Sequence, residues 1–213
     1  MDPVDHIVFI VDDDIRIRES LLELLASHDM RGVAFGSAAE YLAYAKPELP
    51  ACLVLDVQLP DINGLDLQGQ IAAGYHPPII FITGHGDIPS SVRAIKAGAV
   101  DFLTKPFKTA QLMQAIHAAI AQSHASRLKD SVLSNLRQRH ALLTPREREV
   151  LALVVSGRLN KQVAAELGIS EVTTQIHRGH VMHKMKADSL ADLVRMAGIL
   201  ELPLGKPRSQ GSD

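Results

Sequence analysis

Polar residues stand at the C-terminal ends of several short apolar runs. They are Asp12 and Asp13 after residues 7–11, Asp56 after residues 52–55, Thr83 after residues 79–82, and Lys105 after residues 102–104. If the runs are parallel strands of a doubly wound sheet, their carboxyl ends meet in one crevice. Three carboxylates, a hydroxyl and an ammonium group in one crevice would suit a divalent cation and a phosphoryl group.

The chemistry of such a crevice follows from the residue types. A carboxylate can attack phosphorus and form an acyl phosphate, and the transferred group needs cations to neutralise its oxygens. Mg²⁺ accepts carboxylate, carbonyl and water oxygens, and Lys105 would be a second cation. Each Asp also has a purely structural interpretation, because Asp is common in turns and at helix caps. We expect Asp14 to be a helix N-cap rather than a ligand.

The apolar runs are continuous rather than alternating, which is typical of strands buried on both faces of a parallel sheet. Strands are predicted at residues 7–11, 33–35, 52–55, 79–82 and 100–104, with helical patterns between them. Five strands that alternate with five helices predict an α/β doubly wound, five-stranded parallel sheet over residues 6–120.

The composition limits the class of protein. A chain of 213 residues with 46% hydrophobic residues can form one large domain or two smaller ones. Its single cysteine, Cys52, excludes an internal disulfide and fits a reducing compartment. We see no signal peptide and no apolar run of membrane-spanning length, so we expect a cytoplasmic protein without membrane partners.

The charge is unevenly distributed. Residues 1–120 hold 8 Lys/Arg against 15 Asp/Glu, residues 121–140 hold 4 against 1, and residues 141–213 hold 10 against 8. An acidic first part fits a cation site, and a mildly basic second part fits a polyanion such as DNA.

The second part reads as all-α. Thr144-Pro145-Arg146-Glu147 is a capping box with proline at the first helical position. Asn160 can cap a short helix, and Ser170 a longer one that runs to about Met185. A short helix, a turn containing Gly168 and a longer helix predict a helix-turn-helix. We expect domains at residues 1–122 and 141–202, a helical linker at 123–140 without a sustained heptad, and a disordered tail at 203–213.

Residues 6–120 resemble a response-regulator receiver domain. The resemblance is carried by Val11-Asp12-Asp13-Asp14, Leu55-Asp56-Val57-Gln58-Leu59-Pro60, Thr83-Gly84-His85-Gly86-Asp87 and Asp101-Phe102-Leu103-Thr104-Lys105-Pro106-Phe107. It implies that Asp56 accepts a phosphoryl group from a histidine kinase. It also implies Mg²⁺ on Asp12, Asp13, Asp56 and the backbone carbonyl of Gln58, a switch pair of Thr83 and Phe102, Lys105 on the phosphoryl group, and a cis peptide at Pro106. Phe102 stands where many relatives carry Tyr.

Residues 142–200 resemble the DNA-binding domain of the FixJ/NarL (LuxR-type) regulators, and the whole chain resembles the FixJ subfamily. The resemblance is carried by Leu143-Thr144-Pro145-Arg146-Glu147-Arg148-Glu149-Val150-Leu151, Asn160-Lys161-Gln162-Val163-Ala164, Leu167-Gly168-Ile169-Ser170, Val172-Thr173, His177-Arg178, Val181-Met182-His183-Lys184-Met185 and Ser189-Leu190-Ala191-Asp192-Leu193-Val194-Arg195. A recognition helix presents polar side chains to the major groove from one face. The candidate DNA contacts are Asn160, Lys161, Thr173, Thr174, Gln175, Ile176, Arg178, Gly179 and Lys184. Gly179 departs from the larger residue of some relatives.

Three alternatives compete with a phosphorylated DNA-binding protein, and a feature of the sequence argues against each. An aspartate-nucleophile phosphatase of the haloacid dehalogenase type needs a second Asp where this chain has Gln58. A stand-alone phosphate-relay or protein-binding module would lack the helix-turn-helix end. A zinc site on His177, His180 and His183 would lack supporting Cys or carboxylate ligands.

The favoured prediction is a phosphorylation-switched transcription regulator that binds double-stranded DNA. It would be no enzyme beyond promoting its own phosphorylation and slow dephosphorylation, with Gln58 and His85 controlling the latter. Its expected partners are a histidine kinase, RNA polymerase and, when phosphorylated, a second copy of itself.

Overall fold

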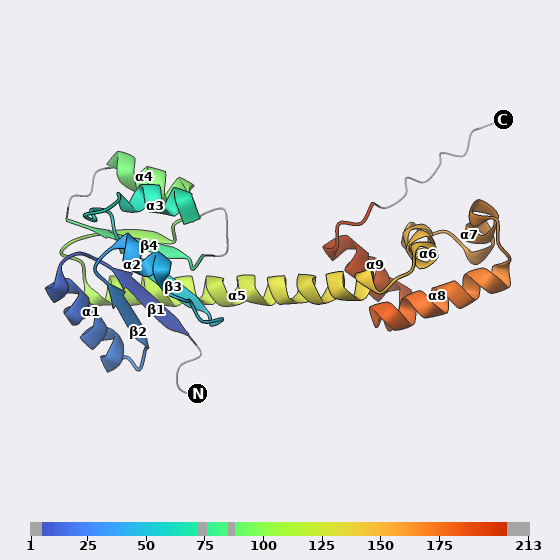
Figure 1. Cartoon of the computed structure of the whole chain (residues 1–213), viewed down its shortest axis with the longest axis horizontal. Coiled ribbons are helices and arrows are strands. Elements are labelled where there is room, and N and C mark those ends of the chain that lie inside the picture. The colour runs from blue at the N-terminus through green and yellow to red at the C-terminus, as the bar shows by residue number, and fades with distance from the viewer. Residues whose placement is uncertain (1–5, 72–75, 85–87, 204–213) are drawn as a thin grey trace. The chain divides into compact units, whose positions relative to one another are not determined.

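The computed structural model describes residues 6–71, 76–84 and 88–203 of the chain (Figure 1). His85 and nearly all of the tail expected at residues 203–213 therefore lie outside the described residues. The chain divides into two compact units, one ending at Leu128 and the other beginning at Lys129. Within the described ranges, no helix is both long enough and apolar enough to cross a membrane.

The first unit contains the predicted parallel sheet. Its strands are β1 (Ile7–Val11), β2 (Gly32–Phe35), β3 (Ala51–Asp56), β4 (Ile79–Thr83) and β5 (Asp101–Thr104), in the order β2-β1-β3-β4-β5. All four neighbouring pairs are parallel. The order places β1 beside β3, so the acidic residues that end these two strands become neighbours. The prediction of a doubly wound, five-stranded sheet is confirmed.

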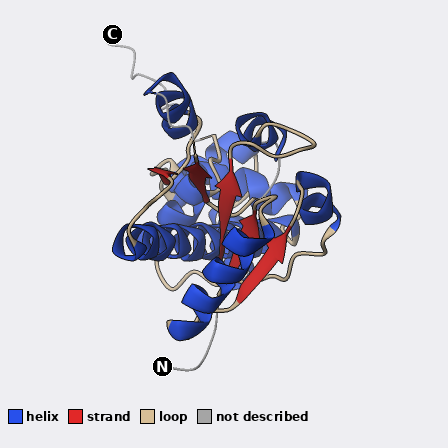
Figure 2. Ribbon diagram, turned by 90° about the vertical axis from the view of Figure 1, so that its left-hand side faces the viewer, coloured by secondary structure: helices blue, strands red, loops and turns tan. Residues whose placement is uncertain are grey.

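Helices cover both faces of this sheet (Figure 2). Helices α1 (Ile15–Ser27) and α5 (Thr109–Ala141) pack on one face, against Val8, Ile10, Val54 and Ile80. Helices α2 (Ala38–Ala43), α3 (Gly64–Ile71) and α4 (Ile88–Lys96) lie on the other face, with Phe9, Leu53 and Phe81. Successive residues of a strand point to opposite faces, so continuous apolar runs supply both cores.

Helix α5 is much longer than the other helices, with 33 residues from Thr109 to Ala141. It includes the whole segment 123–140 that was expected as a linker, and the boundary between the two units falls inside it. In the first unit, the Ser123 hydroxyl accepts a hydrogen bond of 3.0 Å from the backbone amide of Ala51. This buried bond ties α5 to the start of β3.

The second unit consists of the end of α5 with α6 (Pro145–Val155), α7 (Asn160–Leu167), α8 (Glu171–Met185) and α9 (Leu190–Ile199). Their core includes Leu143, Val150, Val163, Val181 and Leu193. The capping box of Thr144 and Glu147 forms as predicted, and Gly168 ends α7 with a φ of 65°. Together α7, the turn and α8 form the predicted helix-turn-helix.

One helix start differs from its prediction. Asn160 is the first residue of α7, and Leu159 is the N-cap. The Leu159 amide donates to the side chain of Gln162 at 2.9 Å. The Asn160 side chain instead accepts a hydrogen bond of 3.0 Å from the Arg178 guanidinium on α8. The capping prediction was therefore wrong, because a partner distant in sequence engages the amide.

Candidate functional site

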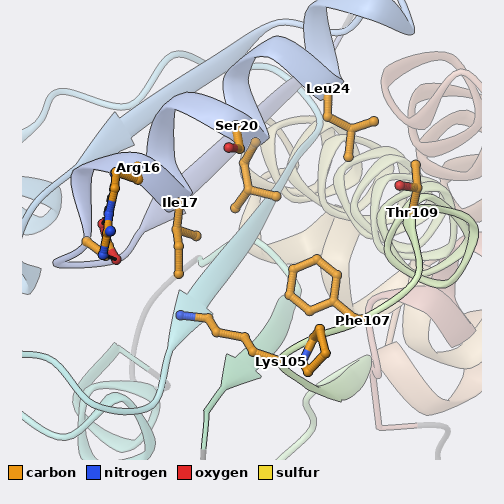
Figure 3. A pocket seen from close by; sticks show the side chains of 10 residues that line it. Arg16, Ile17, Ser20, Leu24, Lys105, Phe107 and Thr109 are labelled. Atoms are coloured by element: carbon orange, nitrogen blue, oxygen red, sulfur yellow. Dashed lines mark hydrogen bonds and ion pairs between the residues drawn. The ribbon is translucent and has the colours of Figure 1, made fainter.

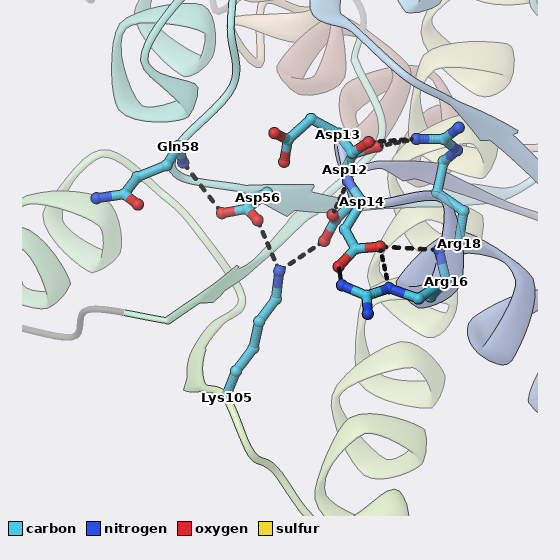
Figure 4. Close-up of polar contacts among 8 residues, drawn as sticks. All are labelled: Asp12, Asp13, Asp14, Arg16, Arg18, Asp56, Gln58 and Lys105. Carbon is cyan, nitrogen blue, oxygen red and sulfur yellow. Dashed lines mark hydrogen bonds and ion pairs between the residues drawn. The ribbon is translucent and has the colours of Figure 1, made fainter.

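The acidic residues predicted from strand ends lie together (Figure 4). Asp12, Asp13 and Asp56 each offer a carboxylate oxygen, and these oxygens lie within 4.8 Å of one another. Asp12 is fully buried and Asp56 nearly so, whereas Asp13 is exposed. The Lys105 ammonium donates to Asp12 Oδ2 and to Asp56 Oδ2, at 2.6 Å in both cases. The parallel order of β1, β3 and β5 therefore brings together residues up to 93 positions apart.

The electrostatics of this cluster follow from burial and from close opposite charges. Burial raises the pKa of Asp12 above its ordinary value, although the hydrogen bond from Lys105 opposes the shift. For Lys105, burial alone would lower the pKa. The hydrogen bonds and charges of Asp12 and Asp56 outweigh burial and raise the pKa of Lys105 instead. The Lys105 ammonium therefore stays protonated between the two carboxylates.

Backbone amides orient the two buried carboxylates. The Asp14 amide donates to Asp12 Oδ1 at 2.9 Å, and the Gln58 amide donates to Asp56 Oδ1 at 3.0 Å. The Asp14 side chain is the N-cap of α1, as predicted, and accepts from the Arg16 amide at 2.9 Å. The Arg16 guanidinium, hydrogen-bonded to this carboxylate, lowers the pKa of Asp14 to about 2. Asp14 is therefore engaged away from the cluster.

Two features near the cluster were not found from the sequence. The Arg18 guanidinium donates to the backbone carbonyls of Asp12 and Asp13, at 2.7 Å and 3.0 Å. Gly64, the first residue of α3, lies so close to the end of β3 that a side chain there would overlap the carbonyl oxygen of Asp56. An arginine in a helix and a glycine at a helix start are too common to signal these contacts.

Thr83, Phe102 and Pro106 also belong to the predicted site. Thr83 is fully buried at the end of β4. Phe102 is half-buried, with its ring centroid 6.1 Å from that of Phe81. The peptide bond between Lys105 and Pro106 is cis. These residues lie on β4, on β5 and in the segment after β5.

The donor set fits Mg²⁺. The converging ligands are carboxylate oxygens, the hard donors that Mg²⁺ prefers, and the exposed Asp13 leaves room for the waters that this ion retains. A pocket of about 600 Å³ opens beside the cluster, between α1 and the segment after β5 (Figure 3). Its lining includes Ile17, Leu24, Lys105 and Phe107.

Helix α8 presents a separate candidate surface in the second unit. Gln175, Ile176 and Gly179 are exposed, and 53% of Ile176 is accessible. Thr174 is fully buried, and its hydroxyl donates to the Ser170 carbonyl at 3.2 Å. The prediction of Thr174 as a DNA contact was therefore wrong, because this residue faces the core of the unit.

Lys184 makes an ion pair within the second unit that was not predicted from the sequence. Its ammonium donates to Glu147 Oε2 at 2.6 Å, and the Glu147 side chain is only 4% exposed. Burial alone would raise the pKa of Glu147. The hydrogen bonds from Lys184 and from the Thr144 amide outweigh burial and lower the pKa of Glu147. Lys184 thus holds α8 to α6 and neutralises a buried charge, which the sequence pattern of α8 could not reveal.

Comparison with known families identifies both units. The family model of the response regulator receiver domain matches residues 8–117, and that of the bacterial regulatory proteins of the luxR family matches residues 141–197. The chain belongs to the response regulator family. Receiver domains take phosphoryl groups from histidine kinases, and the luxR-type domain binds DNA. The phosphatase and stand-alone relay alternatives are thereby excluded for this response regulator.

Named relatives extend along nearly the whole response regulator. It is 53% identical to Nodulation protein W of Bradyrhizobium diazoefficiens over 195 residues, which cover 91% of this chain and 86% of that protein. It is 45% identical to response regulator protein TodT of Pseudomonas putida, over 89% of this chain and 84% of that protein. It is 44% identical to the transcriptional regulatory protein FixJ of Azorhizobium caulinodans, over 89% of this chain and 90% of that protein.

Solved structures agree with this assignment. Response regulator StyR is 43% identical, and the match has a TM-score of 0.82 and covers 92% of this chain and 99% of that one. Full-length FixJ from B. japonicum is 38% identical, with a TM-score of 0.53 and coverage of 92% and 97%. The response regulator is thus a transcription regulator built from a receiver and a luxR-type domain.

Proposed function

We propose that Asp56 is the phosphoacceptor and that Mg²⁺ binds to Asp12, Asp13, Asp56 and the Gln58 carbonyl. The convergence of three carboxylates and the Lys105 ammonium carries this proposal. Mg²⁺ would neutralise phosphoryl oxygens on one side and Lys105 would do so on the other. Asp56 is the member at the centre, because it ends β3, the middle strand of the sheet, and Lys105 binds its carboxylate.

We propose a histidine kinase as the phosphodonor. The donor must bring its phosphorylated side chain to Asp56, so its docking surface must adjoin the acidic cluster. The pocket between α1 and the segment after β5 does so, and Ile17, Leu24 and Phe107 give it apolar walls (Figure 3). Such walls suit the apolar side chains of a partner protein.

We propose that phosphorylation acts through Thr83 and Phe102 on dimer formation. Thr83 ends β4 and Phe102 lies on β5, next to α4. Helix α4 exposes three large apolar residues, Ile88 at 79%, Val92 at 45% and Ile95 at 48%. A patch of this kind marks a protein interface, and we assign it to a second copy of the chain. RNA polymerase is a further proposed partner, because relatives are named transcriptional regulatory proteins.

This switch has a direct test. Sedimentation and DNA binding of the full chain are measured with and without a small-molecule phosphodonor and Mg²⁺. We expect phosphorylation to shift the monomer toward the dimer, and the Ile88→Asp variant to be phosphorylated normally but to remain monomeric. An identical oligomeric state and DNA affinity in both forms would disprove the switch.

In the second unit, we propose that α8 is the recognition helix. Gln175, Ile176, Arg178 and Gly179 would face the major groove, and Asn160, Lys161 and Thr173 would lie near phosphates. The Arg178 guanidinium donates a hydrogen bond to the Asn160 side chain, so each side chain helps to hold the other in place. The exposure of Gln175 and Ile176 supports this assignment.

Replacing Gln175 with Ala is expected to weaken binding to the preferred site by about 1–3 kcal/mol if the amide reads an adenine with two hydrogen bonds. Binding to unrelated DNA should change little, because phosphate contacts supply most non-specific affinity. Mobility shifts on specific and random duplexes measure both quantities. Glu166→Ala on α7 is the control, and it should leave binding to both duplexes unchanged because Glu166 is not a proposed DNA contact. Equal losses on both duplexes would contradict a base-reading role.

We also propose that Gln58 and His85 set the lifetime of the acyl phosphate. Gln58 lies two residues after Asp56, and its exposed side chain can influence water at the phosphoryl group. Replacing Gln58 with Ala should change the dephosphorylation rate severalfold and leave the phosphorylation rate intact. His85→Ala should act similarly, with an effect that varies near the ordinary histidine pKa of about 6.5. Decay of ³²P-labelled protein measures both rates, and unchanged decay in both variants would refute the proposal.

A further inference from the structure

Arg18 makes an unusual contact in the first turn of α1. One nitrogen of its guanidinium, Nη1, donates to the backbone carbonyls of Asp12 and Asp13, at 2.7 Å and 3.0 Å (Figure 4). A cation in the first turn of a helix is unfavourable, because the helix N-terminus carries partial positive charge. The carboxylate of the N-cap residue, Asp14, lies at this end of the helix but is paired with Arg16 rather than with Arg18. Arg18 is instead held by two backbone carbonyls, whose oxygens carry partial negative charge.

These two carbonyls belong to the residues that offer carboxylates to the cation. Because one nitrogen binds two consecutive carbonyls, a rotation of either of the peptide units that carry them would break a hydrogen bond. The other side of this segment is also fixed. The Asp12 amide donates to the Phe35 carbonyl at 3.2 Å, and Asp12 Oδ1 accepts from the Asp14 amide at 2.9 Å.

We propose that Arg18 is a positioning residue that holds the Asp12–Asp13 backbone so that both carboxylates face Mg²⁺. This inference rests on the proposed Mg²⁺ site. Arg18 contacts neither the cluster of carboxylate oxygens nor Lys105 through any hydrogen bond recorded for the described residues, so its effect on the ion passes through the backbone. An ion that demands near-ideal octahedral geometry is sensitive to such orientation.

Gly36, just after β2, provides the surface under the guanidinium. A Cβ atom at this position would lie 3.5 Å from Arg18 Nη1 and 3.7 Å from Cζ. A methyl group is therefore tolerated, whereas a branched side chain would push the guanidinium away from the two carbonyls. Position 36 gives a second route to the same backbone segment with Arg18 left intact.

A role of Arg18 through its charge and a role through positioning predict opposite changes in Mg²⁺ affinity when Arg18 is replaced. If Arg18 acted only through its charge, removing it would strengthen Mg²⁺ binding, because a cation near the site would be lost. If Arg18 positions the backbone, removing it weakens Mg²⁺ binding despite the lost repulsion. Arg16 is the matched control. It lies two residues away on the same helix, is exposed, and pairs with Asp14 rather than with the Asp12–Asp13 carbonyls.

The test measures the Mg²⁺ dissociation constant of the unphosphorylated full chain by amide chemical shifts. We expect Arg18→Met to raise this constant about tenfold, which corresponds to roughly 1.4 kcal/mol. Arg18→Lys, which keeps the charge and one donor nitrogen, should recover part of the loss. Arg16→Met should leave the constant unchanged or lower it. Gly36→Val should weaken binding and Gly36→Ala should not.

Thermal unfolding without Mg²⁺ separates positioning from loss of fold. If Arg18→Met fails to fold, the Arg18→Lys and Gly36→Val variants decide, and unchanged Mg²⁺ binding in both would overturn the proposal. Equal or tighter binding in a folded Arg18→Met variant would also overturn it. If the wild-type protein bound no Mg²⁺, or if Asp13→Asn left its binding intact, the proposed Mg²⁺ site itself would be wrong.

Discussion

Loss of Mg²⁺-dependent labelling by acetyl phosphate is the expected result of Asp56→Asn. The substitution keeps the shape of the side chain and removes the nucleophilic carboxylate, so labelling should fall by about a thousandfold or more. The fold should persist, because Asn fills the same space and its one oxygen can still accept either the bond from Lys105 or the bond from the Gln58 amide, which Asp56 accepts on separate oxygens. Incorporation of ³²P and the circular dichroism spectrum measure these two outcomes.

Asp66→Asn is the matched control for this experiment. Asp66 is an exposed carboxylate on α3. It pairs with Arg93 at 2.8 Å rather than with a residue of the acidic cluster. Its loss should leave labelling unchanged. Labelling of the Asp56→Asn protein at the wild-type rate would place the phosphoacceptor elsewhere in the chain.

Replacing Lys184 with Met should destabilise the second unit by about 2–3 kcal/mol. Breaking a buried ion pair from one side costs about 3–5 kcal/mol. We take a smaller value because the Lys184 side chain is 32% exposed, so water can reach Glu147 in the variant. Amide hydrogen exchange in α6 and α8 of the full chain measures the loss. Weaker DNA binding by this variant would follow from unfolding, so it is no measure of a phosphate contact.

The pH dependence of this effect has a definite sign. The pKa of Glu147 is lower in the folded protein than its ordinary value of 4.5. Its contribution to stability is therefore fully present above pH 4.5 and is lost as the pH falls through the lowered pKa. Without Lys184, burial raises the pKa of Glu147, so the stability gap between wild type and Lys184→Met should close as the pH falls from the higher pKa of the variant to the lowered pKa of the wild type. Lys184→Met combined with Glu147→Gln should recover stability, and failure to do so would contradict the charge argument.

The sequence predicted those parts of the molecule that depend on short-range pattern. The apolar runs marked the strands, and the polar residues that end them met at one sheet edge because parallel strands share a direction. Thr144 and Ser170 were recognised as caps from their own neighbours in the chain. The acidic cluster of Asp12, Asp13 and Asp56 could be predicted for the same reason.

Contacts between distant residues could not be predicted in this way. Asn160 looks like a cap, but Arg178 lies 18 residues away and engages its side chain. Lys184 looks like a surface cation, but Glu147 lies 37 residues away and is buried beneath it. Thr174 stands between the polar residues Thr173 and Gln175, yet it lies on the buried face of α8. Each outcome depends on which face of a helix its neighbour covers, and short-range pattern does not contain that information.

The close approach of Gly64 to the Asp56 carbonyl has a consequence for how this chain can evolve. The Cβ atom of an alanine at position 64 would overlap the backbone at the end of β3, and every larger residue carries the same atom. Many positions of a protein accept several residue types, but no single substitution of Gly64 fits the present backbone. A lineage can escape only by changing a second residue that re-routes the end of β3. Selection on the end of β3 is thereby extended to Gly64, a residue that contributes no side chain to the acidic cluster.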